Sequence, residues 1–253
     1  MSEVSFSNLE EFLRHHKYTK DKNKLTHTRI GNSDLGIHGG CYSIENDDLI
    51  DFYKLYYKKV FVQKQNEYLT ELQNRKEGGP LLVDFDFRYD NDVSERQHSD
   101  DTISDIIDLY VENIFKLLKL EDTEFKIYVM QKDNINVLSN IVKDGIHMVF
   151  GIHMDHIKQQ LLRNMLLKKS PDTGNKSVIM YECLGDLNLT NSAQDVLDEG
   201  ISKGSTGWQL FGSRKPGNEA YKLTNIFTVS YSKPEEDYDD GFDITEGDID
   251  EFD

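Results

Sequence analysis

The chain has 253 residues, of which 37% are hydrophobic and 11% aromatic, enough for one large domain or two small interlocked ones. Its formal net charge of -17 argues against a generic nucleic-acid binder, which would carry a basic surface. No window approaches the ~18 apolar residues of a membrane span, and the N-terminus lacks the apolar centre of a signal peptide. We therefore expect an intracellular protein with no membrane partner.

The two cysteines, Cys41 and Cys183, are too few for a disulfide framework or for a zinc site of the four-cysteine kind. No structural zinc is expected. Residues 235–253 carry eleven acids and no Lys or Arg, so residues 1–234 sum to only -6. A block of this composition is typical of a disordered acidic tail or linker.

The first half of the chain predicts helices separated by short strands. Leu9, Phe12 and Leu13 stand at helical spacing, which predicts a helix over residues 7–17 capped by Ser7 or Asn8. The glycine-rich residues 26–44 predict a hairpin. A helix is predicted over residues 47–60, where we interpret the tyrosine-rich stretch as amphipathic rather than as a nucleic-acid platform. A strand begins at residue 81, and residues 102–120 form the clearest helix.

The second half alternates in the same way. Strands are predicted at residues 125–130, 145–151, 208–211 and 221–229, and a helix at 155–167. Asn191 or Ser192 caps a short helix that runs to about Asp198. We expect His156 on the surface and Arg163 on a solvated helix end. Strands and helices interleave without an internal repeat, so the predicted class is α+β.

Two acids end the apolar run GGPLLVDFDFRYD, residues 78–90. In a strand, alternate side chains share a face, which places the Asp84 and Asp86 carboxylates on one side, with the two Cα atoms about 7 Å apart. Two unpaired like charges are costly to bury, and a divalent cation would remove that cost. The alternative is a strand that ends in a solvated acidic turn.

Two later segments carry further candidate residues. In KDGIHMVFG, His147 lies on the strand face opposite Ile146 and Met148; such a histidine is often structural. After an acid pair, Asp198 and Glu199, the turn at residues 212–215 holds Ser213, Arg214 and Lys215. Such a turn can bind a phosphate through backbone N–H groups and charge, or it is a plain solvated hairpin turn.

In this order, VDFDF, DGIHMVF and LDEGISKGSTGWQLFGSRK resemble the three motifs of the archaeo-eukaryotic primase superfamily, especially the primase domains of primase-helicases from large eukaryotic DNA viruses. The resemblance covers roughly Thr26 to Thr228. It implies an N-terminal αβ unit packed on an RRM-like antiparallel sheet with helices. Residues 1–234 would be the catalytic domain, divided near residue 80 into subunits of about 1–80 and 81–234.

The resemblance also implies the function of matched residues. Asp84, Asp86 and Asp198 would hold two Mg²⁺ or Mn²⁺ ions, with Asp195 and Glu199 as competitors for the third place. His147, Lys215 and Arg214 would bind the phosphates of a nucleoside triphosphate, ribo- or deoxy-, together with the turn at Ser213. Gly145 stands where the family often has a small hydroxyl residue, so one phosphate contact would be lost.

The expected activity is primer synthesis on single-stranded DNA during viral replication, at a site in the host cytoplasm or nucleus, coupled to a helicase domain or subunit. Two alternatives use the same residues. One is a metal-dependent nuclease, because two-carboxylate chemistry would also serve hydrolysis. The other is a non-catalytic primase-like module that binds nucleic acid or docks a helicase.

Overall fold

The computed structural model describes residues 5–20, 24–168, 179–232 and 241–249 and divides the chain into two compact units. Unit 1 comprises Met1–Gln73 and Ser205–Tyr221, and unit 2 comprises Asn74–Gly204 and Lys222–Asp253. The division differs from the predicted boundary near residue 80. Segment 205–221 belongs to unit 1 because its strand and turn bond to the N-terminal segment, a long-range pairing with no local signal in the sequence.

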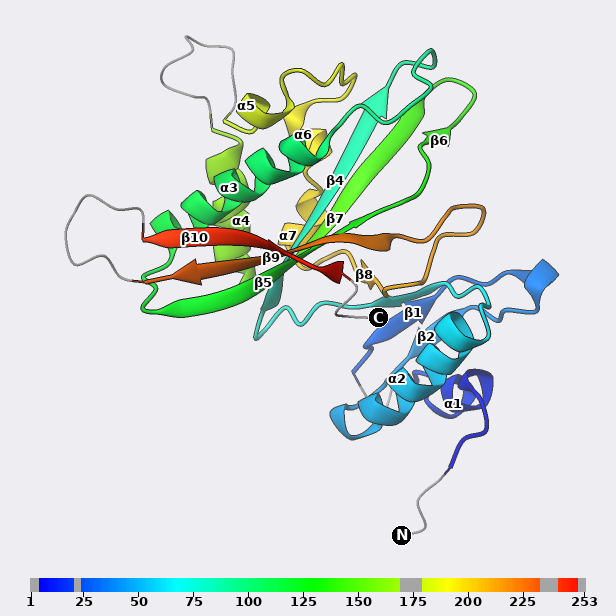
Figure 1. Ribbon diagram of the computed structural model, residues 1–253. Helices are drawn as coiled ribbons and strands as arrows, with labels where there is room; N and C mark the ends of the chain where they lie inside the picture. The colour runs from blue at the N-terminus through cyan, green and yellow to red at the C-terminus, as the bar shows by residue number, and fades with distance from the viewer. Residues whose placement is uncertain (1–4, 21–23, 169–178, 233–240, 250–253) are drawn as a thin grey trace. The chain divides into compact units, whose positions relative to one another are not determined.

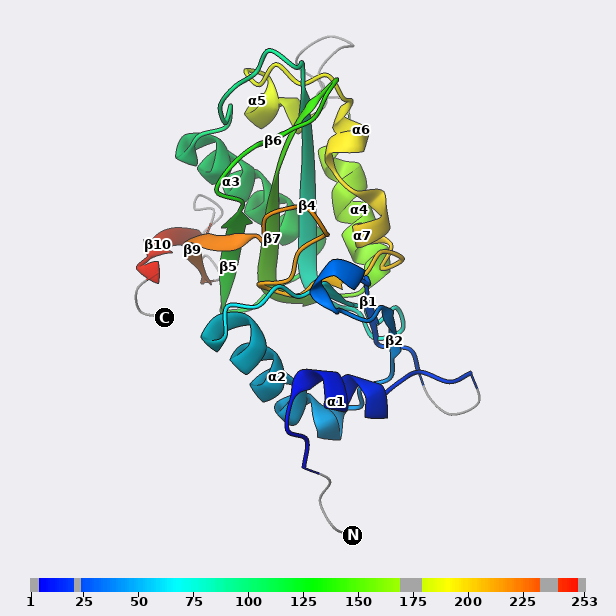
Figure 2. The same ribbon diagram turned by 90° about the vertical axis from the view of Figure 1, so that its right-hand side faces the viewer.

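Unit 1 packs its helices on a sheet (Figure 2), whose four antiparallel strands run in the order β2-β1-β3-β8. Its buried cluster joins Leu9 and Phe12 of one helix to Phe52 and Tyr56 of the next and to Leu69 of the sheet. Asn8 caps the first helix through a hydrogen bond from the Glu11 amide, as predicted. In chain order the elements are α1 (Leu9–His15), β1 (His27–Arg29), η1 (Ser33–Leu35), β2 (Gly40–Tyr42), η2 (Asn46–Asp48), α2 (Leu49–Tyr57), the π-helical η3 (Lys58–Val62), β3 (Leu69–Glu71) and β8 (Trp208–Gln209).

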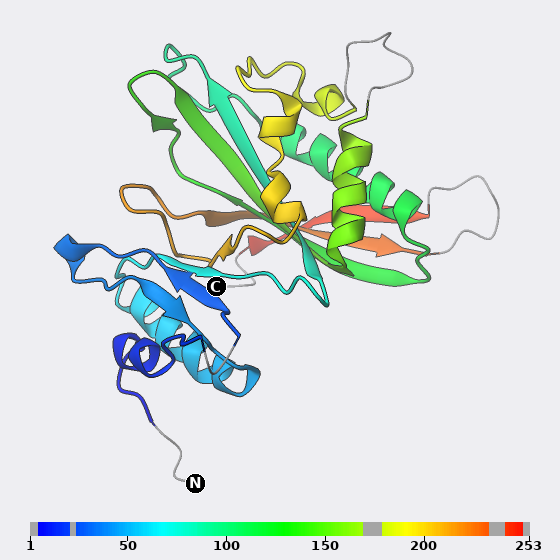
Figure 3. The same ribbon diagram turned by 180° about the vertical axis from the view of Figure 1, so that it is seen from behind.

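Unit 2 is a six-stranded antiparallel sheet whose main path runs β10-β9-β5-β7-β4, with β6 paired to β7 (Figure 1). Helices α3 and α4 cover one face of this sheet, and α6 and α7 lie beside its edge strand β4 (Figure 3). The elements are β4 (Gly79–Tyr89), α3 (Asp100–Leu117), β5 (Thr123–Gln131), β6 (Asn136–Val137), β7 (Val142–Met154), α4 (His156–Leu166), α5 (Tyr181–Leu184), α6 (Ala193–Val196), α7 (Glu199–Ser202), β9 (Lys222–Tyr231) and β10 (Phe242–Gly247).

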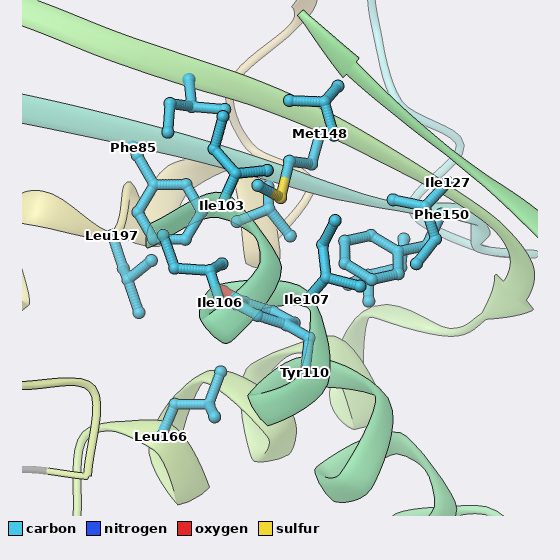
Figure 4. Packing of buried hydrophobic residues seen from close by; sticks show 14 of the residues in the cluster. Phe85, Ile103, Ile106, Ile107, Tyr110, Ile127, Met148, Phe150, Leu166 and Leu197 are labelled. Carbon is cyan, nitrogen blue, oxygen red and sulfur yellow. The ribbon is translucent and has the colours of Figure 1, made fainter. Parts of the chain in front are cut away.

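The core of unit 2 lies between α3 and the sheet. Ile103, Ile106 and Ile107 of α3 point toward Phe85 and Met148 of the neighbouring strands (Figure 4), and all five side chains are almost fully buried. A capping box at Ser99 and Thr102 starts α3, confirming the predicted helix with its first residue at Asp100. Burial of these apolar side chains is the main force that orients β4, and it therefore decides which β4 side chains face the other way.

The acidic C-terminal segment is not a disordered tail where the structure describes it. Residues 242–247 form β10, which pairs with β9 along its length. Phe242 and Ile244 pack against the core of unit 2, while Asp243 between them is exposed. The prediction was wrong for this stretch because overall charge hid a strand-like alternation; residues 233–240 and 250–253 lie outside the described part.

None of the described helices is both long enough and apolar enough to cross a bilayer.

Candidate functional site

Strand β4 presents Asp84 and Asp86 on one face, as the alternation predicted. Val83, Phe85 and Phe87 are at most 5% exposed and face the core, so the intervening acids must face the opposite side. Asp86 is exposed, and the side chain of Asp84 is 21% exposed. The strand therefore holds one half-buried and one solvated carboxylate in register.

His147 is the cross-strand neighbour of Asp84. In the antiparallel ladder of β4 and β7, Asp84 pairs with His147 and Asp86 pairs with Gly145. Nε2 of His147 lies 3.4 Å from Oδ1 of Asp84, and the His147 side chain is 10% exposed. Gly145 brings no side chain to the position across from Asp86, and its N–H donates to the Asp144 carboxylate at 2.9 Å.

Asp198 reaches this site through the edge of β4. Its amide donates to the Asp84 carbonyl at 3.2 Å, and the preceding Leu197 forms a β-bridge with Phe85. Its own Oδ1 accepts a hydrogen bond from the Ile201 amide, which makes Asp198 the N-cap of α7 rather than the end of a helix as predicted. Asp84 and Asp198 also line one cavity of about 20 Å³, room for roughly one water molecule.

The two competitors for the third acidic position are bonded elsewhere. Asp195 accepts a hydrogen bond from Ser192 within the first turn of α6, and Glu199 is exposed and paired with Lys203 at 2.8 Å. This ion pair lowers the pKa of the Glu199 carboxyl below its ordinary value. Of the three candidate acids, Asp198 is the one whose backbone is hydrogen-bonded to β4 at Asp84.

Two residues that sequence reasoning did not assign to the site fix its backbone. The side-chain amide of Asn191 donates to the Asp86 carbonyl at 2.8 Å and accepts from the Arg88 amide at 3.1 Å. The guanidinium of Arg163 donates to the Leu197 carbonyl and to the Gln194 carbonyl, and it thereby fixes the loop before Asp198. The prediction that Arg163 lies on a solvated helix end was therefore wrong. Neither role has a local sequence signal, since the partners are more than 30 residues away.

The carboxylate oxygens of Asp84 and Asp86 are the kind of ligand that a hard divalent cation prefers. Oδ1 of Asp84 is buried and accepts no hydrogen bond from any residue in the described ranges. Within those ranges, no three His, Cys, Asp or Glu side chains already surround one point. Mg²⁺ needs no such cage, because one or two carboxylates together with substrate phosphates and waters complete its coordination. Asp84 and Asp86 could therefore supply the two protein carboxylates of such a site.

The predicted phosphate-binding turn lies in unit 1, whereas Asp84, Asp86, Gly145, His147 and Asp198 lie in unit 2. Ser213 is 1% exposed; its Oγ accepts from the Leu69 amide and bonds to the Tyr56 hydroxyl. The amides of Ser213 and Arg214 donate to the carbonyls of Leu210 and Glu67. The structure thus contradicts a phosphate contact through these groups of Ser213, while Lys215 is exposed and its role remains a prediction.

Comparison with known proteins identifies the family of the chain. Residues 31–227 match the family model described as the C962R protein N-terminal AEP domain, where AEP denotes the archaeo-eukaryotic primases. A protein of Acanthamoeba polyphaga mimivirus that carries a helicase name, L207/L206, is 31% identical over 190 residues. That alignment covers 74% of this chain but only 18% of the relative's length. The chain therefore belongs to the archaeo-eukaryotic primase family, with a domain of the C962R N-terminal type.

Proposed function

We propose that this domain is the catalytic part of a DNA primase-polymerase that extends or starts chains on single-stranded DNA. The observation that carries the proposal is the arrangement of Asp84, Asp86 and His147 on β4 and β7, in a chain that belongs to the archaeo-eukaryotic primase family. A site with two carboxylates on one strand face suits the transfer of nucleotides, because the negative charge of a triphosphate can share divalent cations with it.

In this proposal Asp84 and Asp86 hold Mg²⁺ or Mn²⁺, with Asp198 as a third carboxylate. Bound there, the ions would supply Lewis-acid stabilisation as a 3′ hydroxyl attacks the nucleotide's α-phosphate and pyrophosphate leaves. His147 would contact the nucleotide's phosphates beside Asp84, since its imidazole is the cross-strand neighbour of that carboxylate. Asn191 would keep Asp86 in register by holding its carbonyl.

A helicase partner is proposed on separate grounds. The mimivirus relative has a helicase name and is much longer than the segment that aligns here. We propose that primer synthesis is coupled to a helicase, as a further domain or as a subunit, and that the setting is replication of a large viral DNA. Co-purification of the helicase with this domain during expression of the replication proteins would test this.

The catalytic proposal is tested by incorporation of labelled nucleotides on single-stranded DNA, with and without a primer, in Mg²⁺ or Mn²⁺. Asp84→Asn and Asp86→Asn should each lower incorporation by at least about 100-fold, the scale of losing a charge-stabilising group. Asp90→Asn is the matched control, because Asp90 is an exposed acid just beyond the end of β4. Wild-type rates in both site variants would sink the proposal.

A further inference from the structure

Three aromatic rings of unit 1 form a stacked series at the surface, which we call the aromatic ladder: Tyr57, Phe61 and Phe211. The Tyr57 and Phe61 rings are 5.6 Å apart at 25° between planes, and those of Phe61 and Phe211 are 5.6 Å apart at 23°. Its two ends are open to solvent, since Tyr57 is 60% and Phe211 47% exposed. Exposed aromatic rings with free faces are available to stack on a further flat ring.

The ladder is held rigidly although its ends are exposed. The Tyr56 hydroxyl donates to the Phe211 carbonyl at 2.7 Å. Gly212 follows with a φ of 84°, and a Cβ added there would lie 2.7 Å from Val60 Cγ1 and 2.8 Å from Phe61 Cζ. Only glycine lets this turn approach the π-helix so closely, and the approach is what aligns Phe211 with Phe61.

The two segments that carry the ladder's rings are basic. Residues 52–66 contain four lysines and no acid, and residues 205–218 contain Arg214 and Lys215 and no acid. Lys54 and Lys58 follow Tyr53 and Tyr57 by one position, which places them on the adjoining stripe of α2 and η3. Two of these lysines are paired with acids: Lys59 with Glu10 and Glu67, and Lys54 with Asp51 at 3.5 Å. The Lys54–Asp51 pair is exposed on both sides and therefore weak, so Lys54 is still available to a phosphate, whereas Lys59 is not.

The two units also differ in total charge. Unit 1 has twelve basic and twelve acidic residues, a net charge of zero, so the whole of the chain's -17 belongs to unit 2. A polyanion would therefore meet less repulsion at unit 1 than at unit 2, apart from any bound cations.

We propose that the aromatic ladder is a stacking platform for the bases of single-stranded DNA, with Lys54 and Lys58 beside the phosphates. Base stacking on aromatic rings is tolerant of sequence, as a template-binding surface requires, and the lysines match the phosphate charge. A duplex is a poorer occupant because its base faces are already stacked on each other. The inference rests on the proposed function only in the choice of DNA as the natural ligand.

The test measures binding of a fluorescein-labelled oligothymidylate of 20 nucleotides to the full chain. Fluorescence anisotropy reports the binding, at one fixed salt concentration and without metal or nucleotides. Tyr57→Ala and Phe211→Ala should each weaken binding about tenfold. Tyr57→Phe keeps the ring and should bind like wild type. Ile157→Ala is the matched control, because Ile157 is a 73% exposed apolar residue on α4 of unit 2.

A second probe separates stacking from charge. An abasic strand with the same number of phosphates should bind wild type about tenfold more weakly than the oligothymidylate, and Tyr57→Ala should cause no further loss on it. Oligothymidylate affinity that is unchanged in both alanine variants would overturn the proposal. An equal loss on both strands would also overturn it, since the ring would then not be reading bases. Circular dichroism checks that each variant is folded.

The result is independent of the catalytic proposal. Asp86→Asn should keep oligothymidylate binding while losing incorporation. If Asp86→Asn incorporates nucleotides normally, the proposed function fails and the binding data still stand. If Tyr57→Ala binds normally while Asp86→Asn is inactive, the platform fails and the catalytic site stands.

Discussion

The Asp84 carboxylate and the His147 imidazole are cross-strand neighbours, with Oδ1 and Nε2 3.4 Å apart. The pair sits on the polar face of a sheet whose other face is buried against α3, so neither side chain can move to the other face without a change of register. The pairing of β4 with β7 thus fixes a carboxylate and an imidazole next to each other.

Replacing His147 tests whether that imidazole serves a nucleotide. His147→Gln should raise the KM for the incoming nucleotide and lower kcat/KM by about 10- to 100-fold, the range for losing a hydrogen bond to a charged group. Steady-state primer extension gives both constants. The matched control is His153→Gln, an exposed residue on the same face of β7. Equal effects of the two variants would remove His147 from the proposed site.

The two hydrogen bonds between the Asn191 side chain and the β4 backbone should contribute to both stability and activity. Asn191→Ala removes two hydrogen bonds to the β4 backbone, so the free energy of unfolding should fall by roughly 1–3 kcal/mol. Urea denaturation measures this change, and primer extension by the folded variant should also be slower because Asp86 loses its fixed carbonyl. Asn188→Ala, at an exposed neighbouring position, should leave both quantities unchanged.

Unit 1 should lose stability in mild acid because of His27. Burial lowers the pKa of His27 to about 4, below the ordinary value of 6.5. Between these two pH values the unfolded chain binds more protons, so folding stability is complete above about pH 6.5 and falls as the pH drops toward 4. The loss is on the order of 3 kcal/mol at most. Thermal unfolding from pH 4 to 7 should show this slope in wild type and a flatter slope in His27→Gln.

The last strand should support unit 2 through Phe242. Its ring stacks on Phe115 with centroids 5.3 Å apart, so Phe242→Ala should lower the free energy of unfolding by about 1–2 kcal/mol. Asp243→Ala, one position away and exposed, is the control and should have little effect. Chemical denaturation of both variants makes the comparison. No difference between them would mean that β10 is dispensable.

The sequence predicted what periodicity and local chemistry determine. The face shared by Asp84 and Asp86 was predictable because Val83, Phe85 and Phe87 fix the orientation of the strand. The helix at 102–120 was predictable from its apolar stripe, and only its ends shifted. The helix expected over residues 47–60 exists, but it continues as a π-helix to Val62, which a fixed period of 3.6 residues does not anticipate.

The prediction failed where a partner distant in sequence decides the outcome. Ser213 looked like a solvated turn residue, yet its hydroxyl is consumed by Tyr56 and Leu69. His156 was expected on the surface and is 8% exposed, because its ring packs against the turn at Gly204. The tyrosine-rich helix was amphipathic as predicted, but Tyr57 and Phe61 gained a third stacking ring from residue 211.

The pairing of β3 with β8 has a consequence for how the protein is made. Unit 1 begins at the N-terminus but is completed by residues 205–221, so a ribosome must synthesise most of unit 2 before Leu69 can meet Ser213. Closing so long a loop costs chain entropy. Until residues 205–221 are made, the N-terminal segment is incompletely folded, and Tyr56 and Val60 are not covered by that segment. An expression fragment that ends at residue 73 should therefore be prone to aggregation, and one that joins 1–73 directly to 205–221 by a short linker is the better starting point.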